Sequence, residues 1–207
     1  MQLLVITPPT SGPDEARHIA GLLADGLPRL HVRKPAFAPA EMQDYVRQIP
    51  ARYHARLVLH GHPPLVAALG LGGLHLTAAA RAALLTAPHR QPGQTLSTSF
   101  HTLAEICRHR RRYDYVFLSP VFDSLSKANY GAAFDLAKVA ATLQQLRRRA
   151  SYRPTVLALG GITATKLARV QQAGFAGAAV LGSIWQTPDP VAAFRALRAA
   201  AKAAAGA

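Results

Sequence analysis

The chain has 207 residues, of which 50% are hydrophobic and 16% are charged. This composition can bury a sizeable core and excludes a largely disordered protein. No apolar stretch reaches the roughly 20 residues of a membrane span, and the first residues lack the basic segment of a signal peptide. The single cysteine excludes an internal disulfide and a thiolate zinc cluster. We therefore expect one cytoplasmic domain, residues 1–207, with no membrane contact and no indicated oligomeric state.

Eight short apolar runs alternate with helical patterns along the chain. The runs are Gln2–Ile6, Arg29–Val32, Arg56–Leu59, Leu74–Leu76, Thr95–Thr98, Tyr115–Leu118, Thr155–Leu159 and Ala178–Leu181. The helical patterns cover Asp14–Ala24, Pro39–Gln48, Pro64–Leu69, a less regular segment through Arg90, Thr102–Arg110, Phe134–Arg148, Thr163–Ala173 and Pro190–Ala204. Nearly continuous apolar runs are typical of parallel strands that are buried on both faces. The pattern predicts an α/β fold, a single (β/α)8 TIM barrel, with a doubly wound sheet as the alternative.

The chain is strongly basic, with 24 Lys and Arg against ten Asp and Glu and a formal charge of +14. Such a charge suits nucleic acid, anionic lipid or phosphorylated small molecules. The basic runs 108–112 and 147–149 close two predicted helices, so in a barrel they lie on the face opposite the active site. They match no nucleic-acid-binding module. We therefore expect phosphorylated small-molecule substrates as partners, and no nucleic acid.

Two glycine-containing junctions follow the seventh and eighth predicted strands. They carry Gly160 with Gly161, and Leu181 with Gly182 and Ser183. In a TIM barrel the loops after these strands form the common phosphate site, because backbone N–H groups and a helix N-terminus face the anion. The pattern favours phosphate binding, and a pair of tight turns is the alternative.

Polar side chains also end the second, fifth and sixth strands. Alternation places His31 and Arg33 on one side of the second strand, towards the barrel mouth, and turns Lys34 away. Ser99 and His101 close the fifth strand in the same way. The loop after the sixth strand offers two hydroxyls and an ammonium as donors to phosphate, at Ser124, Ser126 and Lys127.

Together these residues resemble the family of thiamine phosphate synthases and thiazole tautomerases over nearly the whole chain. The most specific parts are Asp114–Lys127, Leu159–Thr163 and Gly177–Pro190. The family fold is a (β/α)8 barrel. Its synthases join hydroxymethylpyrimidine diphosphate to thiazole phosphate, which gives thiamine phosphate and diphosphate. The resemblance implies a transferase of thiamine biosynthesis.

The resemblance also assigns roles by position. The family's Gln-x-Arg-x-Lys motif falls on residues 31–35, where Arg33 is kept and the lysine comes one residue early, and the Thr-x-Thr-Lys loop falls on residues 124–127. Arg33 and Lys127 are the implied catalytic residues, because they would neutralise the departing diphosphate. The implied substrate-binding residues are His31, His60, Ser99, Ser124, Ser126, Gly160, Gly161, Leu181, Gly182 and Ser183.

The first departure from the family pattern concerns the residues that bind the metal. The two family aspartates that hold Mg²⁺ fall on Gly61 and near Ala79 or Ala80, so we expect no protein-held metal or other cofactor. Mg²⁺ would then reach the site only as a complex with the substrate diphosphate, and synthase activity should be weak or absent.

The same departures leave other functions open. A tautomerase of this family would carry a catalytic histidine in the sixth loop, where the chain has Ser119 and Pro120. One alternative is a regulatory or non-catalytic protein that binds thiazole phosphate or thiamine phosphate. Another is a thiazole tautomerase-like isomerase that uses His31, His60 or His101 as its proton shuttle. A nucleic-acid adaptor comes last.

Overall fold

The computed structural model describes residues 1–86, 88–123 and 134–206. Its eight strands pair in chain order into a closed parallel barrel, with β8 returning to β1. The strands are β1 (Gln2–Ile6), β2 (Leu30–Val32), β3 (Leu57–His60), β4 (Gly73–Leu76), β5 (Thr95–Phe100), β6 (Tyr115–Leu118), β7 (Val156–Leu159) and β8 (Gly177–Val180). The predicted TIM barrel is confirmed, and the doubly wound alternative is wrong because no sheet edge is left open.

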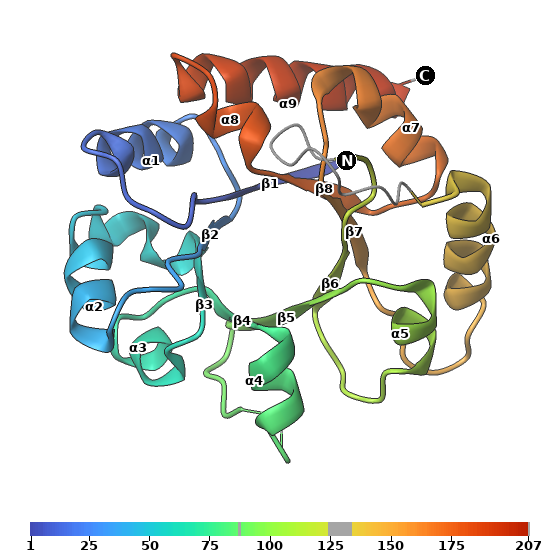
Figure 1. The fold of residues 1–207 in the computed structure, drawn as a ribbon, viewed down its shortest axis with the longest axis horizontal. Helices are drawn as coiled ribbons and strands as arrows, with labels where there is room; N and C mark the ends of the chain where they lie inside the picture. The colour runs from blue at the N-terminus through green and yellow to red at the C-terminus, as the bar shows by residue number, and fades with distance from the viewer. Residues whose placement is uncertain (87, 124–133, 207) are drawn as a thin grey trace.

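Helices form a ring around the barrel (Figure 1). They are α1 (Glu15–Ala24), α2 (Pro39–Arg47), α3 (Pro63–Ala68), α4 (Ala78–Ala83), α5 (Leu103–Arg108), α6 (Leu136–Arg147), α7 (Leu167–Gln172), α8 (Gly182–Trp185) and α9 (Pro190–Gly206), with 3-10 turns η1 (Ala51–Arg56) and η2 (Ala164–Lys166). The sequence pattern missed η1 and the four-residue α8, because elements this short show no periodicity. In the ranges described, each helix is too short or too polar to serve as a bilayer span.

The two faces of the strands carry different cores. Side chains that point outward pack against the helices in one large apolar cluster, which includes Val5, Val32 and Val116. Side chains that point into the barrel include a smaller cluster with Leu4 and Phe117. Because side chains alternate along a strand, the continuous apolar runs of the sequence supply both layers at once.

The helix-to-strand turns use glycine where the backbone requires it. Gly174 follows α7 with a φ of +85°, a left-handed conformation that glycine adopts without a steric penalty. Gly177 opens β8, and a Cβ there would lie 2.5 Å from the carbonyl oxygen of Gln2. Gly174 therefore suits the turn after α7, and Gly177 lets β8 lie directly against β1.

The basic runs lie where helices end and the next strands begin, which is the face opposite the carboxyl ends of the strands. Arg111 donates from Nη2 to the carbonyl oxygen of Leu84 at 2.7 Å, and Arg149 donates to that of Cys107 at 3.0 Å. Arg110 and Arg112 are exposed. The predicted position of these runs is confirmed, and part of their charge is used to bind peptide carbonyls between helices.

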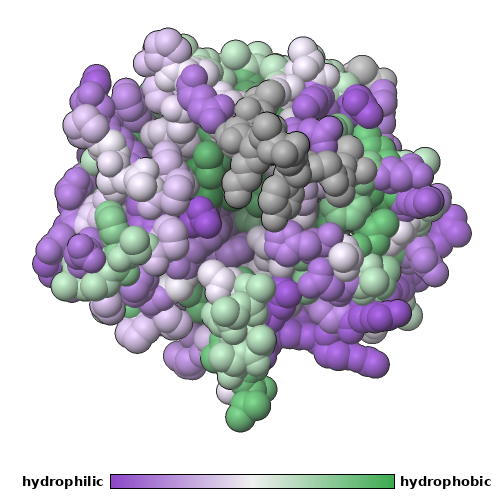
Figure 2. Space-filling view, viewed as in Figure 1, coloured by the Kyte–Doolittle hydropathy of each residue, from purple (hydrophilic) through white to green (hydrophobic). Residues whose placement is uncertain are grey.

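The surface in the same view is mainly hydrophilic, with an apolar patch over α4 (Figure 2). Leu85, just after α4, is 98% exposed. The helix itself is mostly alanine, and none of its residues is fully buried. This patch lies on the outer ring of helices and not in the barrel.

Candidate active site

A cavity of about 520 Å³ opens at the carboxyl ends of the barrel strands. Backbone and small side chains from the ends of β7 and β8 form one part of its wall, and polar side chains from β2, β3, β4 and β5 form another. The residues that carry the argument below are Arg33, His60, His75, Ser99, His101, Gly160, Gly161, Leu181, Gly182 and Ser183. In a TIM barrel the strand ends at this face position the groups that act on a ligand.

The glycine-containing loops after β7 and β8 are joined to each other. The Ser183 hydroxyl donates to the carbonyl oxygen of Ile162. Gly182 and Ser183 begin α8, so their N–H groups have no partner within the helix. Lys166 donates from Nζ to the Gly161 carbonyl oxygen at 3.0 Å, which places a positive charge beside the first loop. The residues of these two loops that were predicted to bind phosphate thus lie together on one wall, next to a cation.

The two loops differ in how much their glycines are needed for packing. Gly161 has a φ of +62°, and a Cβ there would lie 2.3 Å from the carbonyl oxygen of Asp123. Gly161 is therefore required by the close approach of the loops after β6 and β7. A Cβ at Gly182 would meet the flexible side chain of Gln186 at 3.1 Å. Gly182 is the position where glycine leaves space in the cavity.

The polar wall follows from strand alternation. His60 ends β3, His75 lies within β4 and Ser99 lies within β5, and all three side chains face into the barrel and line the cavity. Arg33 comes directly after β2 and is exposed in the cavity. Its backbone N–H donates to Thr7 Oγ1 at 2.9 Å, which fixes the chain at the barrel mouth.

His31 does not line this cavity, which corrects the location expected for it from the sequence. Its side chain is fully buried inside the barrel, beneath the wall. Its Nδ1 lies 3.0 Å from His60 Nε2, and its Nε2 lies 2.8 Å from the Tyr115 hydroxyl. His31 therefore contacts His60, which lines the cavity, and is not itself among the cavity-lining residues. Strand alternation predicted the correct side of β2 for the His31 side chain, but it could not predict how deep inside the barrel that side chain lies.

Lys34 is turned away from the cavity, as alternation predicted. Its Nζ donates to Glu15 Oε1 at 2.7 Å and to the carbonyl oxygens of Pro8 and Thr10. The Tyr45 hydroxyl also donates to Glu15. Both charged side chains are at least nine-tenths buried, so this pair holds α1 against the end of β2.

His75 is the main cavity residue that the sequence analysis missed. Its register on β4 opposite His60 of β3 places the two rings 4.1 Å apart, stacked at 19°. Burial lowers the pKa of His75 to about 3, and the guanidinium groups of Arg81 and Arg33 act in the same direction. Burial also lowers the pKa of His60 well below its usual value. Both rings are therefore neutral at neutral pH.

Three predicted residues, Ser124, Ser126 and Lys127, lie outside the described residues. The positions of the family aspartates can be compared directly. Gly61 offers no side chain, and Ala79 and Ala80 in α4 offer only methyl groups. Among the described residues that line the cavity, none is an aspartate or glutamate. Mg²⁺ takes oxygen ligands, so these residues do not fit a protein-held magnesium ion.

Different protein families share a closed barrel with glycine-containing loops after β7 and β8. The family of this chain is therefore assigned by sequence comparison. The profile of the thiamine monophosphate synthase family matches residues 3–184. The chain belongs to this family. It is 31% identical to a thiamine-phosphate synthase of Methanoculleus marisnigri, over an alignment of 210 positions that covers 97% of each chain. The family to which the chain belongs is a family of transferases.

Solved structures agree with this assignment. The crystal structure of a thiamine phosphate pyrophosphorylase from Bacteroides thetaiotaomicron matches with a TM-score of 0.80 and 29% identity over 98% of each chain. A thiamine phosphate pyrophosphorylase from Pyrococcus furiosus matches with a TM-score of 0.74 and 20% identity, over 98% of this chain and 96% of that one. The second match shows the shared fold alone.

Proposed function

We propose that the protein couples hydroxymethylpyrimidine diphosphate to thiazole phosphate, giving thiamine phosphate and diphosphate at a slow rate. The observation that carries this proposal is the two-sided cavity. One wall offers the N–H groups of Gly182 and Ser183 to a phosphate, and the other presents the Arg33 guanidinium. The two walls suit two phosphorylated substrates that meet between them.

The coupling needs positioning and charge neutralisation more than proton transfer. The bond between the pyrimidine methylene carbon and the diphosphate oxygen breaks, and diphosphate leaves with the electron pair. The lone pair of the thiazole nitrogen then forms the new carbon–nitrogen bond. Arg33 neutralises charge on the leaving diphosphate, while Ser99 donates a hydrogen bond beside it.

The slow rate follows from the missing carboxylates. A diphosphate carries several negative charges, and one guanidinium offsets them only in part. Since the described cavity residues include no carboxylate to hold Mg²⁺, the ion would arrive bound to the diphosphate itself. The proposal therefore includes a requirement for Mg²⁺ well above that of an enzyme with two metal-binding aspartates.

The test is incubation of the purified chain with both precursors and Mg²⁺, with thiamine phosphate detected by mass. We expect product in proportion to enzyme concentration, and a loss of at least tenfold in rate for Arg33→Gln. Arg47→Gln is the matched control, because Arg47 lies on α2, is exposed and forms an ion pair with the exposed Asp44, away from the cavity-lining residues. Binding of both precursors without product would overturn the proposal in favour of a non-catalytic binding protein. An equal rate for Arg33→Gln would remove the role of Arg33.

A second candidate, an isomerase of thiazole phosphate, is favoured by the position of His101. Its Nδ1 lies 2.8 Å from the Ser119 carbonyl oxygen, which can only accept, so Nδ1 carries the proton. In the neutral ring Nε2 is then free to take a proton from a ligand in the cavity. Thiazole phosphate incubated in D₂O with the enzyme should exchange a carbon-bound proton, and His101→Gln should abolish this while His18→Gln does not. No exchange in the unaltered enzyme excludes the isomerase.

A further inference from the structure

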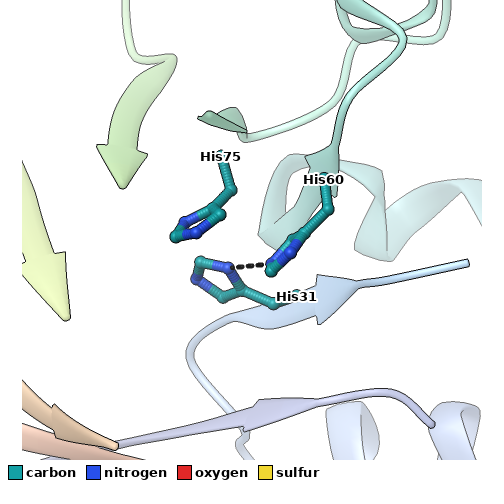
Figure 3. Close-up of side chains that lie close together, drawn as sticks. All are labelled: His31, His60 and His75. Atoms are coloured by element: carbon teal, nitrogen blue, oxygen red, sulfur yellow. Dashed lines mark hydrogen bonds between the residues drawn. The ribbon is translucent and has the colours of Figure 1, made fainter. Parts of the chain in front are cut away.

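Three histidines converge inside the barrel mouth from three neighbouring strands. His31 comes from β2, His60 from β3 and His75 from β4, and Figure 3 shows their rings facing one another. One ring nitrogen from each lies within 4.8 Å of the other two. His31 Nδ1 and His60 Nε2 are 3.0 Å apart. A tetrahedral zinc site with Zn–N bonds of about 2.05 Å needs nitrogen atoms about 3.3 Å apart, so the spacing is close to that of a bound ion. The stacked rings of His60 and His75 would have to turn relative to each other for their lone pairs to meet at one ion.

Hydrogen bonds from the surrounding strands orient the rings. The Tyr115 hydroxyl lies 2.8 Å from His31 Nε2, which leaves Nδ1 facing His60. Both nitrogens of His75 have a hydroxyl partner, Ser97 at 2.9 Å and Ser99 at 3.1 Å. Whichever His75 nitrogen bound an ion, the other would keep its serine. Metal-binding histidines are held in this way by groups on the second ring nitrogen.

The charges around the cluster decide which ions and ligands suit it. Burial lowers the pKa of all three histidines, so their lone pairs are available at neutral pH. Neutral imidazoles suit Zn²⁺, Co²⁺, Ni²⁺ or Cu²⁺ and do not suit Mg²⁺ or Ca²⁺. Among the described residues, the charged side chains that act on the cluster are cationic, with Arg33 and Arg81 acting on His75 and Arg29 on His31. A divalent ion here would therefore need an anionic fourth ligand to offset the positive charge.

In the described part of the chain, the cluster meets the cavity on one side. His60 and His75 line the cavity, whereas His31 closes the cluster from below. Ser99 also lines the cavity next to His75. A fourth ligand would therefore enter from the cavity, on the side of the exposed Arg33.

We propose that His31, His60 and His75 form a three-imidazole site for a borderline divalent cation such as Zn²⁺, with its fourth position open to the cavity. An anionic oxygen, such as one from a phosphate group, completes the coordination. The ion is held where the barrel offers nitrogen ligands in place of the carboxylates of a magnesium site. No proton is released on binding, because each ring stays neutral and any proton on a coordinating nitrogen moves to the other nitrogen of the same ring.

The site is tested on the chelator-treated full chain with Zn²⁺ and Co²⁺ alone, independently of any enzyme activity. We expect one equivalent of Zn²⁺ by calorimetric titration, and a visible Co²⁺ spectrum of four-coordinate type that changes on addition of inorganic phosphate. His60→Gln and His75→Gln should each weaken Zn²⁺ binding at least tenfold. His62→Gln is the matched control, because His62 lies two residues from His60 but outside the cluster, and should leave affinity within twofold.

Several results would overturn the site. They are Zn²⁺ affinity unchanged by His60→Gln, a Co²⁺ spectrum of octahedral type, or no stoichiometric Zn²⁺ binding by the unaltered chain. Circular dichroism establishes that each variant is folded. If a glutamine variant fails to fold, Tyr115→Phe takes its place, since it removes only the hydroxyl that orients His31. Its Zn²⁺ affinity should fall, and unchanged affinity in this variant counts against the site.

Discussion

Acidification should destabilise the barrel well before its carboxylates are protonated. His75 has a pKa of about 3 in the folded protein, against its ordinary value of 6.5. As the pH falls, the His75 ring is therefore protonated in the unfolded chain before it is protonated in the folded protein. The contribution of the neutral ring to the free energy of unfolding is present above pH 6.5 and is lost as the pH falls towards 3. Between neutral pH and about pH 5 this difference is worth about 2 kcal/mol for His75 alone. The pKa of His31 and that of His60 are lowered by burial too, and they add to the loss.

The assay is chemical unfolding in the presence of chelator at about pH 7.5 and about pH 5. The free energy of unfolding should fall by at least about 2 kcal/mol between them. His75→Gln is the informative variant, because glutamine cannot titrate. It should be less stable at pH 7.5, since it loses bonds to Ser97 and Ser99, but it should lose about 2 kcal/mol less on acidification. An equal loss in both proteins would refute the assignment of the pH dependence to this ring.

Three further predictions concern other parts of the fold. Glu15→Gln should lower the free energy of unfolding by about 3–5 kcal/mol, measured with urea, because it leaves the Lys34 ammonium buried without its counter-charge. Replacing the exposed Arg110 and Arg112 by Gln should leave thiazole phosphate affinity unchanged in calorimetric titration, and a clear loss would contradict their place on the far face. Gly182→Val should weaken phosphate binding at least tenfold, or about 1.4 kcal/mol, because the valine side chain takes up space in the cavity. The chain should still fold, since a Cβ at this position meets the flexible side chain of Gln186. Unchanged affinity would remove the loop after β8 from the phosphate site.

The barrel could be predicted from the sequence because its strands are buried on both faces. Val5, Val116 and Val156 face the helices, while Leu4, Phe117 and Leu157 fill the interior, so β1, β6 and β7 are apolar on both faces. This pattern does not depend on which strands are neighbours. The short α8 and η1 could not be found in this way, because they are positioned by tertiary contacts and not by a periodic apolar face.

The candidate site was only partly predictable. Loop glycines and Arg33 could be found because they follow apolar strands directly. The cluster of His31, His60 and His75 depends on the register between β2, β3 and β4, in which His60 lies opposite His75. A single sequence carries no direct signal of that register. The depth of His31 likewise depends on barrel closure, which brings Tyr115 of β6 across the interior to meet it.

The central claim is that this cavity couples two phosphorylated precursors although the described wall holds no carboxylate for Mg²⁺. The most direct measurement is the rate of thiamine phosphate formation, detected by mass at saturating precursors, as free Mg²⁺ is raised from excess chelator. The account predicts no product in chelator and a slow, enzyme-proportional rate that rises only as the Mg²⁺–diphosphate complex forms. A full rate in chelator would contradict the account, and so would the absence of product at every Mg²⁺ concentration.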